Sequence, residues 1–327
     1  MKKDNRRGRP VLLIVILILV LVFVISGLQF LESTVFHPTG TTEDQNRKTI
    51  VRDGISYFPR QDMTVILLAG IDEFGPVTDS GSYNNTGEAD MVTLLVFDET
   101  SKALDVLTLN RDTMLDMPIL GIGGKEAGTI HGQLALAHTY GSGLEDSAVN
   151  LRKTVSNFLY GVHIDYYVTM HMDAISILND LVGGVKVNVT DDFSAIDPAI
   201  GMGEVVLKGE QAITYVRTRQ GLGDQLNVTR MQRQRDYMVG FLHALKEQIS
   251  DSATFALDAY NKTSDYAVTD CSSSAITALA NRLIGYELRD VVPIEGQNVA
   301  GDRYMEYHVD KDALDRVILK YLYEPKN

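Results

Sequence analysis

The apolar run Met63-Thr-Val-Ile-Leu-Leu-Ala-Gly-Ile71 gives the strongest single indication of the architecture. A strand with one wet face alternates apolar and polar residues, whereas a strand covered on both faces is apolar almost throughout. Two more apolar runs, Met91–Phe97 and Leu104–Leu109, follow it and indicate the next two strands. The three runs therefore predict the centre of a sheet that is buried on both faces.

Further strands and helices alternate along the rest of the chain. Further strands are predicted at Tyr166–Met170, Val185–Val189, Val291–Ile294 and Met305–His308, of which Val185–Val189 alternates as a strand should. Helical patterns cover Gln133–His138, Asp146–Leu159, Asp173–Leu181, Gly209–Tyr215, Thr229–Ile249, Ser272–Ile284 and Lys311–Tyr323. Thr229 is expected to be the N-cap of the longest helix. This alternation predicts an α/β fold with three layers, α/β/α, around a central mixed β-sheet.

A long apolar segment, Val11 to Leu28, lies near the N-terminus. At 1.5 Å per residue it is long enough to cross the roughly 30 Å hydrocarbon core of a bilayer. Five of the first ten residues are Lys or Arg, and no other basic residue follows until Arg47. The positive-inside rule then predicts a cytoplasmic N-terminus. A cleaved signal peptide is the alternative, although its apolar core is usually only about 7–15 residues long.

These features divide the chain into a cytoplasmic tail at 1–10, a transmembrane helix at 11–30, a linker or arm at 31–60 and an extracellular domain at 61–327. The formal net charge is −13, with the acidic excess beyond the basic N-terminus, which argues against nucleic acid as a partner. Cys271 is the only cysteine. No disulfide can therefore form within the chain, and the domain needs a hydrophobic core.

Charged residues follow or precede the three central strands. Asp72 follows the first strand, Asp90 opens the second, and Arg111 and Asp112 follow the third. If the first and third strands run parallel with the second antiparallel between them, these residues share one rim of the sheet, where α/β folds bind ligands. Two carboxylates beside an arginine can hold Mg²⁺ against a phosphate, so Asp72 and Asp90 are candidate metal ligands. The alternative is that both acids only terminate strands.

Five arginines fall within nineteen residues of an otherwise acidic chain, namely Arg217, Arg219, Arg230, Arg233 and Arg235. Clustered guanidinium groups repel each other unless an anion lies between them, and their planar forks match phosphate oxygens. The helix that begins near Arg230 also brings Gln234 to the same face. The alternative is a solvated helix face with a few ion pairs.

An apolar stripe continues along that helix through Tyr237, Met238, Phe241, Leu242 and Leu245. Two interpretations stay open. The stripe is either ordinary core packing or the wall of an apolar channel that leads away from a phosphate site.

Six landmarks, in this order, carry a resemblance to a known family. They are Ile66–Asp72, Ala89–Thr93, Leu109–Thr113, Ile164–Val168, Leu181–Val185, and Arg217-Thr-Arg219 leading to Arg230-Met-Gln-Arg233-Gln234. With them the chain resembles the LytR-CpsA-Psr family of Gram-positive cell-envelope proteins, over about residues 62–250 and the N-terminal anchor.

The resemblance implies a membrane-anchored, extracellular phosphotransferase. Such an enzyme moves a glycan phosphate, from teichoic acid or capsule, from a polyprenyl-diphosphate carrier to peptidoglycan. Carried over by position, Asp72 and Asp90 would be Mg²⁺ ligands. The pyrophosphate would be held by Arg111, Arg217, Arg219, Arg230, Gln234 and the neighbouring Arg233. Arg111 would act in catalysis, with Asp90 or Asp112 as the base.

The chain departs from the family pattern at three positions. Glu88 stands where an arginine is usual before the second aspartate motif, Asn110 replaces a proline, and Asn227 replaces an aspartate. Two other functions would use the same residues. One is hydrolysis of polyprenyl pyrophosphate, and the other is non-catalytic binding of lipid phosphate with a regulatory role. Neither the transferred glycopolymer, the acceptor sugar nor the oligomeric state is specified by the sequence.

Overall fold

The computed structural model describes residues 49–218, 221–222 and 227–326. The predicted cytoplasmic tail and transmembrane helix, most of the linker, and Arg219 lie outside the described residues. Within these ranges, no helix combines the length and apolarity that a bilayer crossing requires. Residues 47–327 belong to one unit by their internal contacts.

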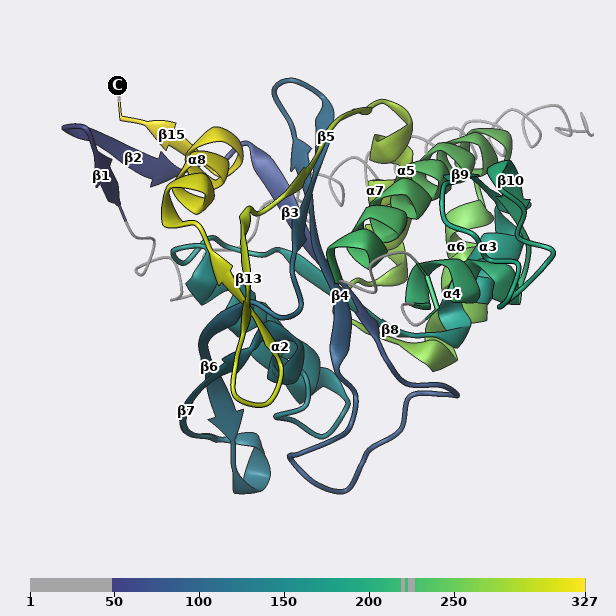
Figure 1. Cartoon of the computed structure of the whole chain (residues 1–327). Helices are drawn as coiled ribbons and strands as arrows, with labels where there is room; N and C mark the ends of the chain where they lie inside the picture. The colour runs from purple at the N-terminus through teal and green to yellow at the C-terminus, as the bar shows by residue number, and fades with distance from the viewer. Residues whose placement is uncertain (1–48, 219–220, 223–226, 327) are drawn as a thin grey trace, which may run out of the picture. The chain divides into compact units, whose positions relative to one another are not determined.

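The core of this unit is a six-stranded sheet in the order β11-β8-β3-β4-β5-β12 (Figure 1). The strands are β3 (Met63–Ile71), β4 (Ala89–Asp98), β5 (Ala103–Leu109), β8 (Tyr166–His171), β11 (Ala267–Thr269) and β12 (Glu287–Pro293). β4 is antiparallel to both β3 and β5, while β8 and β12 are parallel to their neighbours β3 and β5. The predicted central mixed sheet is therefore confirmed, as is the antiparallel β4 between two parallel strands.

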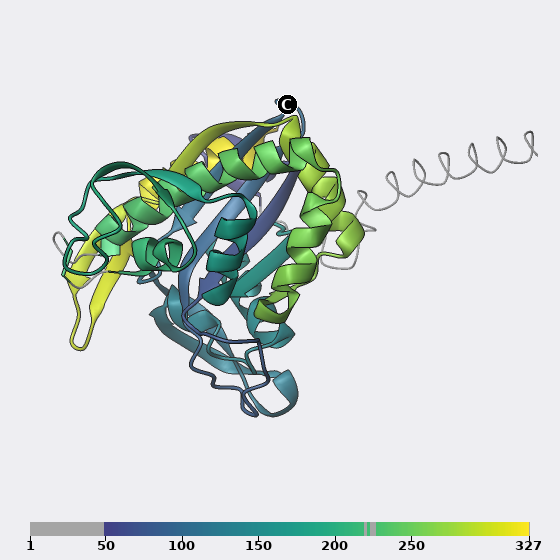
Figure 2. The ribbon, with the colours of Figure 1, turned by 90° about the vertical axis from the view of Figure 1, so that its right-hand side faces the viewer.

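Both faces of the sheet are buried, which explains the continuous apolar run in β3. Val65 and Leu67 point into one core with α2 (Glu145–Phe158) and α8 (Lys311–Tyr321). Ile66 and Leu68, which alternate with them along β3, point into a second core. That core includes side chains of α3 (Asp173–Leu181), α4 (Glu210–Arg217), α5 (Asn227–Asp251), α6 (Phe255–Thr263) and α7 (Ser273–Ile284). Figure 2 shows α5 and its green neighbours lying across this face.

Smaller sheets complete the unit and were not predicted in full. They are the pairs β6 (Met114–Leu120) with β7 (Glu126–Gln133), β9 (Val185–Val189) with β10 (Gly203–Leu207), and β13 (Gly296–Ala300) with β14 (Met305–Val309). A fourth small sheet joins β1 (Ile50–Arg52), β2 (Ile55–Pro59) and the C-terminal β15 (Tyr323–Pro325). The last part of the predicted linker is thus paired with the chain's other end.

Three local predictions need correction. Thr229 lies inside α5, which begins at Asn227, so it is not the N-cap. The segment Gln133–His138 contains only the short 3-10 helix Leu134–Ala137, because β7 extends through Gln133. The closing helix ends at Tyr321, since Tyr323 pairs with Pro59 as a strand residue.

Candidate functional site

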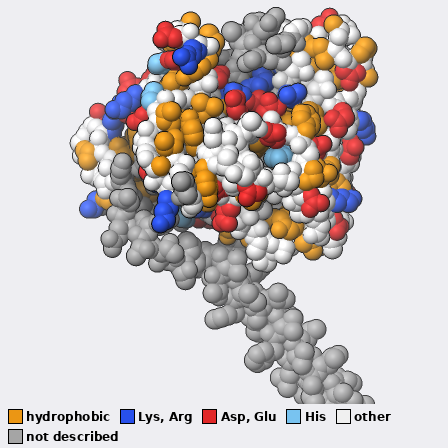
Figure 3. Space-filling view, turned by 90° about the horizontal axis from the view of Figure 1, so that it is seen from below, with side chains coloured by type: hydrophobic (Ala, Val, Ile, Leu, Met, Phe, Trp, Pro, Cys, Tyr) orange, Lys and Arg blue, Asp and Glu red, His pale blue; other side chains and the backbone are white. Residues whose placement is uncertain are grey.

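The rim predicted to hold the charged residues is formed by the ends of β3, β4 and β5. Because β4 runs opposite to its neighbours, Asp72 after β3, Asp90 at the start of β4 and Arg111 after β5 all lie at this edge. A bulge at Gly70/Ile71 interrupts the pairing next to Asp72. Figure 3, which views the molecule from below, shows basic and acidic side chains gathered close together on the face at this end of the sheet.

Asp90 is the centre of the charged cluster. Its side chain is only 7% exposed, and one carboxylate oxygen accepts a hydrogen bond of 2.8 Å from Nη1 of Arg230. The other oxygen pairs with Nη1 of Arg111. Arg230 comes from the first turns of α5 and is itself buried. Two guanidinium groups from distant segments therefore neutralise one buried carboxylate, as buried charges require.

Arg111 faces three carboxylates with its three nitrogens. Nη1 pairs with Asp90, Nη2 with Glu88, and Nε with Asp112 at 3.3 Å. Asp112 also accepts a 3.0 Å hydrogen bond from Gln133, and its own backbone N–H is bonded to the side chain of Asn110. With Arg230 included, three acids meet two guanidinium groups, so this part of the rim carries an excess of negative charge.

A second, more exposed pair lies at the same rim. Nε of Arg217 donates to Asp72 at 3.0 Å, and the side chains are 46% and 34% exposed. The guanidinium also lies over the ring of Phe74, 5.4 Å from its centroid. Arg217 is the last residue of α4, where the helix dipole favours a cation. This guanidinium is therefore held at the rim but stays accessible to a ligand.

Arg233 makes contacts that differ from its predicted role at the phosphate. It is buried, Nε donates to the carbonyl of Tyr215 at 3.0 Å, and the other nitrogens contact Asp191 and the carbonyl of Thr218. These contacts tie α5 to the end of α4 and to the residue before Arg219. In this arrangement each nitrogen of Arg233 contacts the protein, and the side chain anchors the arginine segment.

A cavity opens beside the charged rim, between the sheet and helices α3 and α5. Asp90, Arg217 and Gln234 supply its polar wall. The remaining lining is mainly apolar and comes from Leu68, Gly70, Met91, Met170, Met172, Ile175, Leu178, Val216, Tyr237, Met238 and Phe241. The helix stripe predicted from sequence thus splits: Tyr237, Met238 and Phe241 line the cavity, whereas Leu242 and Leu245 pack in the core.

Two residues that sequence reasoning did not assign hold the loop before β4. The side-chain nitrogen of Asn85 donates to the carbonyls of His138, Thr139 and Gly141, and its oxygen accepts from the N–H of Gly87 at 2.8 Å. His138 bonds the carbonyl of Gly87 through Nδ1 at 2.8 Å. Burial lowers the pKa of His138 to about 4, so it is neutral at pH 7. The only sequence signal was the glycine- and asparagine-rich composition of this loop.

The carboxylates at the rim fit a divalent cation only in part. Among the described residues, no three His, Cys, Asp or Glu side chains come together as a metal site would require. Asp72 and Asp90 offer hard carboxylate oxygens, the kind that Mg²⁺ prefers, and Mg²⁺ usually keeps several waters or phosphate oxygens as ligands. The pair therefore fits an ion that is completed by a bound phosphate.

Comparison with known proteins gives one consistent result. The model of the family described as LytR_cpsA_psr matches residues 28–320. TagU of Bacillus licheniformis, named polyisoprenyl-teichoic acid–peptidoglycan teichoic acid transferase, is 26% identical over 247 residues, which are 74% of this chain and 73% of TagU. TagU of Enterococcus faecalis, with the same full name, is 28% identical over 257 residues, 77% of this chain and 76% of that protein.

Solved structures show the same fold at lower identity. Protein gbs0355 of Streptococcus agalactiae is 21% identical with a TM-score of 0.65, over 80% of this chain and 86% of that one. The structure of TagT bound to LI-WTA is 20% identical with a TM-score of 0.61, over 80% of this chain and 90% of that one. These likenesses support the fold of the described unit.

Proposed function

This chain belongs to the LytR-CpsA-Psr family, and we propose that it transfers a glycan phosphate from a polyprenyl-diphosphate carrier to peptidoglycan. The observation that carries the proposal is the joining of two unlike surfaces: an arginine-rich rim and an apolar cavity that share Asp90, Arg217 and Gln234. A polyprenyl diphosphate has the same two parts. The names of the curated relatives point to the same substrates.

The cavity supports the lipid half of this substrate. Its apolar walls suit a prenyl chain, because each methylene removed from water contributes roughly 0.8 kcal/mol. Four of the lining side chains are methionines, Met91, Met170, Met172 and Met238, and their flexible thioethers adapt to irregular apolar ligands. The diphosphate would then emerge at the wall formed by Arg217 and Gln234.

The rim supports the diphosphate half. Arg111, Arg217 and Arg230 come from three separate segments and meet at one edge, and the sequence adds Arg219 one residue beyond the described Thr218. Phosphoryl transfer proceeds through a loose transition state that needs positioning and charge neutralisation more than covalent chemistry. Converging guanidinium groups supply both.

A divalent cation belongs to this proposal because of the charge balance at the rim. Glu88, Asp90 and Asp112 already exceed the charge of Arg111 and Arg230, and a diphosphate adds further negative charge. Asp72 and Asp90 would hold Mg²⁺. When bound, the ion would neutralise phosphate oxygens at this edge.

The predicted anchor at 11–30 completes the proposal. A single transmembrane helix with its N-terminus in the cytoplasm would put the domain on the outer face of the cell membrane. The carrier lipid is confined to the membrane, so an anchored enzyme meets it by diffusion in two dimensions. The diphosphate linkage would provide the driving force, since no ATP is needed outside the cell.

The bond changes follow from this substrate. A hydroxyl oxygen of the acceptor attacks the phosphorus that bears the glycan, a new oxygen–phosphorus bond forms, and the bond to polyprenyl phosphate breaks. The acceptor proton needs a base. Asp90 and Asp112, the candidates from sequence, are both buried, and guanidinium or amide groups already donate hydrogen bonds to them.

The test is a transfer assay with a short-chain prenyl-diphosphate disaccharide that carries a labelled sugar, with and without peptidoglycan fragments. The proposal expects label on peptidoglycan only when acceptor and Mg²⁺ are both present. Release of labelled sugar phosphate at equal rates without acceptor would favour the hydrolase. Tight lipid binding without any turnover would favour the binding protein.

A further inference from the structure

The surroundings of Arg111 contain one carboxylate unlike the other two. All three face the same guanidinium, but the side chains of Asp90 and Asp112 are 7% and 10% exposed, whereas that of Glu88 is 39% exposed. Asp90 is also bonded to Arg230, and Asp112 to Gln133. Among these interactions, the pair between Glu88 and Arg111 is the one that opens to solvent.

A phosphate that contacts Arg111 competes with these carboxylates for its five N–H groups, because each of the three guanidinium nitrogens already faces an acid. Separating a buried acid from its partners leaves an uncompensated charge inside the protein. An exposed ion pair is held weakly, and its acid is rehydrated as it leaves. Glu88 is therefore the group that an incoming phosphate displaces.

The backbone of Glu88 is fixed even when its side chain moves. Its carbonyl accepts a 2.9 Å hydrogen bond from the N–H of Asp72. The preceding Gly87 is held by Asn85 and His138. A carbon atom added at Gly87 would lie 2.8 Å from the side chain of Ile71, so the chain passes closely over the end of β3. Displacement thus rotates only the side chain, and the carboxylate stays beside the bound phosphate.

We propose that Glu88 is released from Arg111 by the diphosphate and then accepts the proton of the acceptor hydroxyl. This inference rests on the proposed function and names its base. The hydroxyl proton moves to the Glu88 carboxylate as its oxygen bonds to the glycan-linked phosphorus, and polyprenyl phosphate leaves with the electrons of the broken bond. A general base of this kind typically contributes about 10²–10⁴-fold in rate.

The binding arm of the test uses Glu88→Gln with farnesyl diphosphate as the probe. Gln cannot act as a counter-ion, so the probe no longer competes with a carboxylate and should bind several-fold more tightly than to the wild type. Glu126→Gln is the matched control, since Glu126 pairs with Lys153 on an exposed surface and is 48% exposed. Weaker binding by Glu88→Gln would overturn the displacement step.

The transfer arm compares two acceptor alcohols, ethanol and the more acidic trifluoroethanol. Glu88→Gln should transfer to ethanol at least 10²-fold more slowly than the wild type and lose distinctly less with trifluoroethanol, which needs less help from a base. Glu126→Gln should keep wild-type rates. Unchanged transfer by Glu88→Gln, or equal loss with both alcohols, contradicts the role of Glu88. Absence of wild-type transfer to peptidoglycan fragments in the assay above contradicts the proposed function instead.

Discussion

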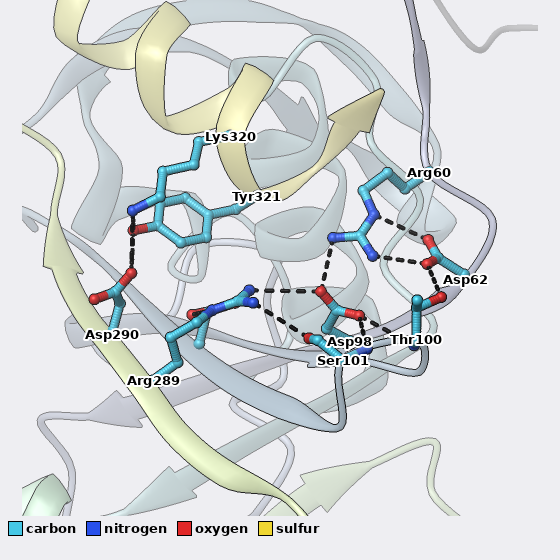
Figure 4. A network of polar contacts seen from close by, with 10 residues as sticks. Arg60, Asp62, Asp98, Thr100, Ser101, Arg289, Asp290, Lys320 and Tyr321 are labelled. Carbon is cyan, nitrogen blue, oxygen red and sulfur yellow. Dashed lines mark hydrogen bonds and ion pairs between the residues drawn. The ribbon is translucent and has the colours of Figure 1, made fainter. Parts of the chain in front are cut away.

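The two ends of the central sheet carry clusters of the same residue types, arginines and carboxylates. The clusters differ in whether the charged groups face only protein partners or also a cavity. At the end opposite the candidate site, Arg60 forms a two-point contact with Asp62 at 2.9 and 2.8 Å and bonds Asp98 at 3.1 Å (Figure 4). Asp98 also accepts from the backbone of Thr100 and Ser101. Every one of these groups faces protein partners, and the cavity beside the candidate site includes none of them.

The difference lies in what surrounds the charges. Burial alone would raise the pKa of Asp98, but the hydrogen bonds from Arg60 and Ser101 outweigh it and hold that pKa well below its usual range. This closed network joins the segment before β3, the β4–β5 turn and Arg289 of β12. The rim at the other end carries acids and guanidinium groups in a similar ratio, but its Asp90 and Arg217 also line a cavity. An arginine–carboxylate cluster therefore supports the fold where its charges face only protein partners, and can bind a ligand where it adjoins a cavity.

Arg111→Ala should have the largest effect on transfer of the substitutions at the two ends of the sheet. Loss of a guanidinium that contacts the transferred group should lower kcat/KM for transfer by about 10³-fold. The melting temperature should also fall, because the buried Asp112 keeps only Gln133, although Asp90 keeps Arg230. Steady-state transfer assays and calorimetry measure the two effects. Arg316→Ala, which removes an exposed arginine from α8, is the control that should change neither.

Asp98→Ala tests the opposite end. Asp98 is the buried acid that Arg60 and Arg289 share, and its loss leaves them only Asp62 and Asp105 and leaves the N–H groups of Thr100 and Ser101 without their acceptor. The free energy of unfolding should therefore fall by about 3 kcal/mol. Transfer per folded molecule should stay at the wild-type value. Urea unfolding measures the change in stability. The transfer assay, run under conditions below the unfolding transition, measures the activity per folded molecule. A variant of normal stability but low activity would reverse the roles assigned to the two ends.

His138 predicts an acid sensitivity at the site end. Its folded-state pKa is about 4, below the value of 6.5 expected when unfolded. Between these pH values the unfolded chain therefore binds more protons than the folded chain. The stability that neutral His138 contributes is fully present above about pH 6.5 and is lost as the pH falls towards 4. At about 1.4 kcal/mol per unit, wild type should lose about 3 kcal/mol over this range relative to His138→Asn. Parallel pH dependences for both proteins would exclude this contribution.

Leu178→Trp changes only the cavity, so it separates binding of a prenyl chain from binding of the diphosphate. The larger ring fills space that a prenyl chain would occupy, so the Kd for geranylgeranyl diphosphate should rise about tenfold, the equivalent of roughly two buried methylenes. Binding of inorganic pyrophosphate should not change. Val206→Trp, at a half-exposed position of β10, controls for the added aromatic ring. Titration calorimetry distinguishes the outcomes.

The central strands could be predicted because burial on both faces leaves a continuous apolar run, as in β3, and because β9 alternates strictly. The hairpin β6–β7 could not, since the sequence of β7, Glu126–Gln133, is mostly polar and contains two glycines. The C-terminal β15 has only three residues and depends on β2 for its pairing. Strand length and backbone pairing, which leave little trace in side-chain type, decide these elements.

The candidate site was predictable to a similar degree. Strand ends placed Asp72, Asp90 and Arg111 together once β4 was taken as antiparallel. Arg230 and Arg233 could not be separated, because residues three apart lie close together on a helix and only the tertiary partners Asp90 and Asp191 assign them different directions. The cavity was left as one of two alternatives, since apolar stripes that line cavities and those that fill cores have the same periodicity.

The most direct test is whether the protein binds a prenyl diphosphate more tightly than pyrophosphate without the prenyl chain. Titration calorimetry would compare geranylgeranyl diphosphate with inorganic pyrophosphate, in the wild type, Arg111→Ala and Leu178→Trp. The account predicts that the prenyl diphosphate binds at least 10²-fold more tightly than pyrophosphate, that Arg111→Ala weakens both, and that Leu178→Trp weakens only the prenyl form. Equal affinity for the two ligands, unaffected by filling the cavity, would contradict it.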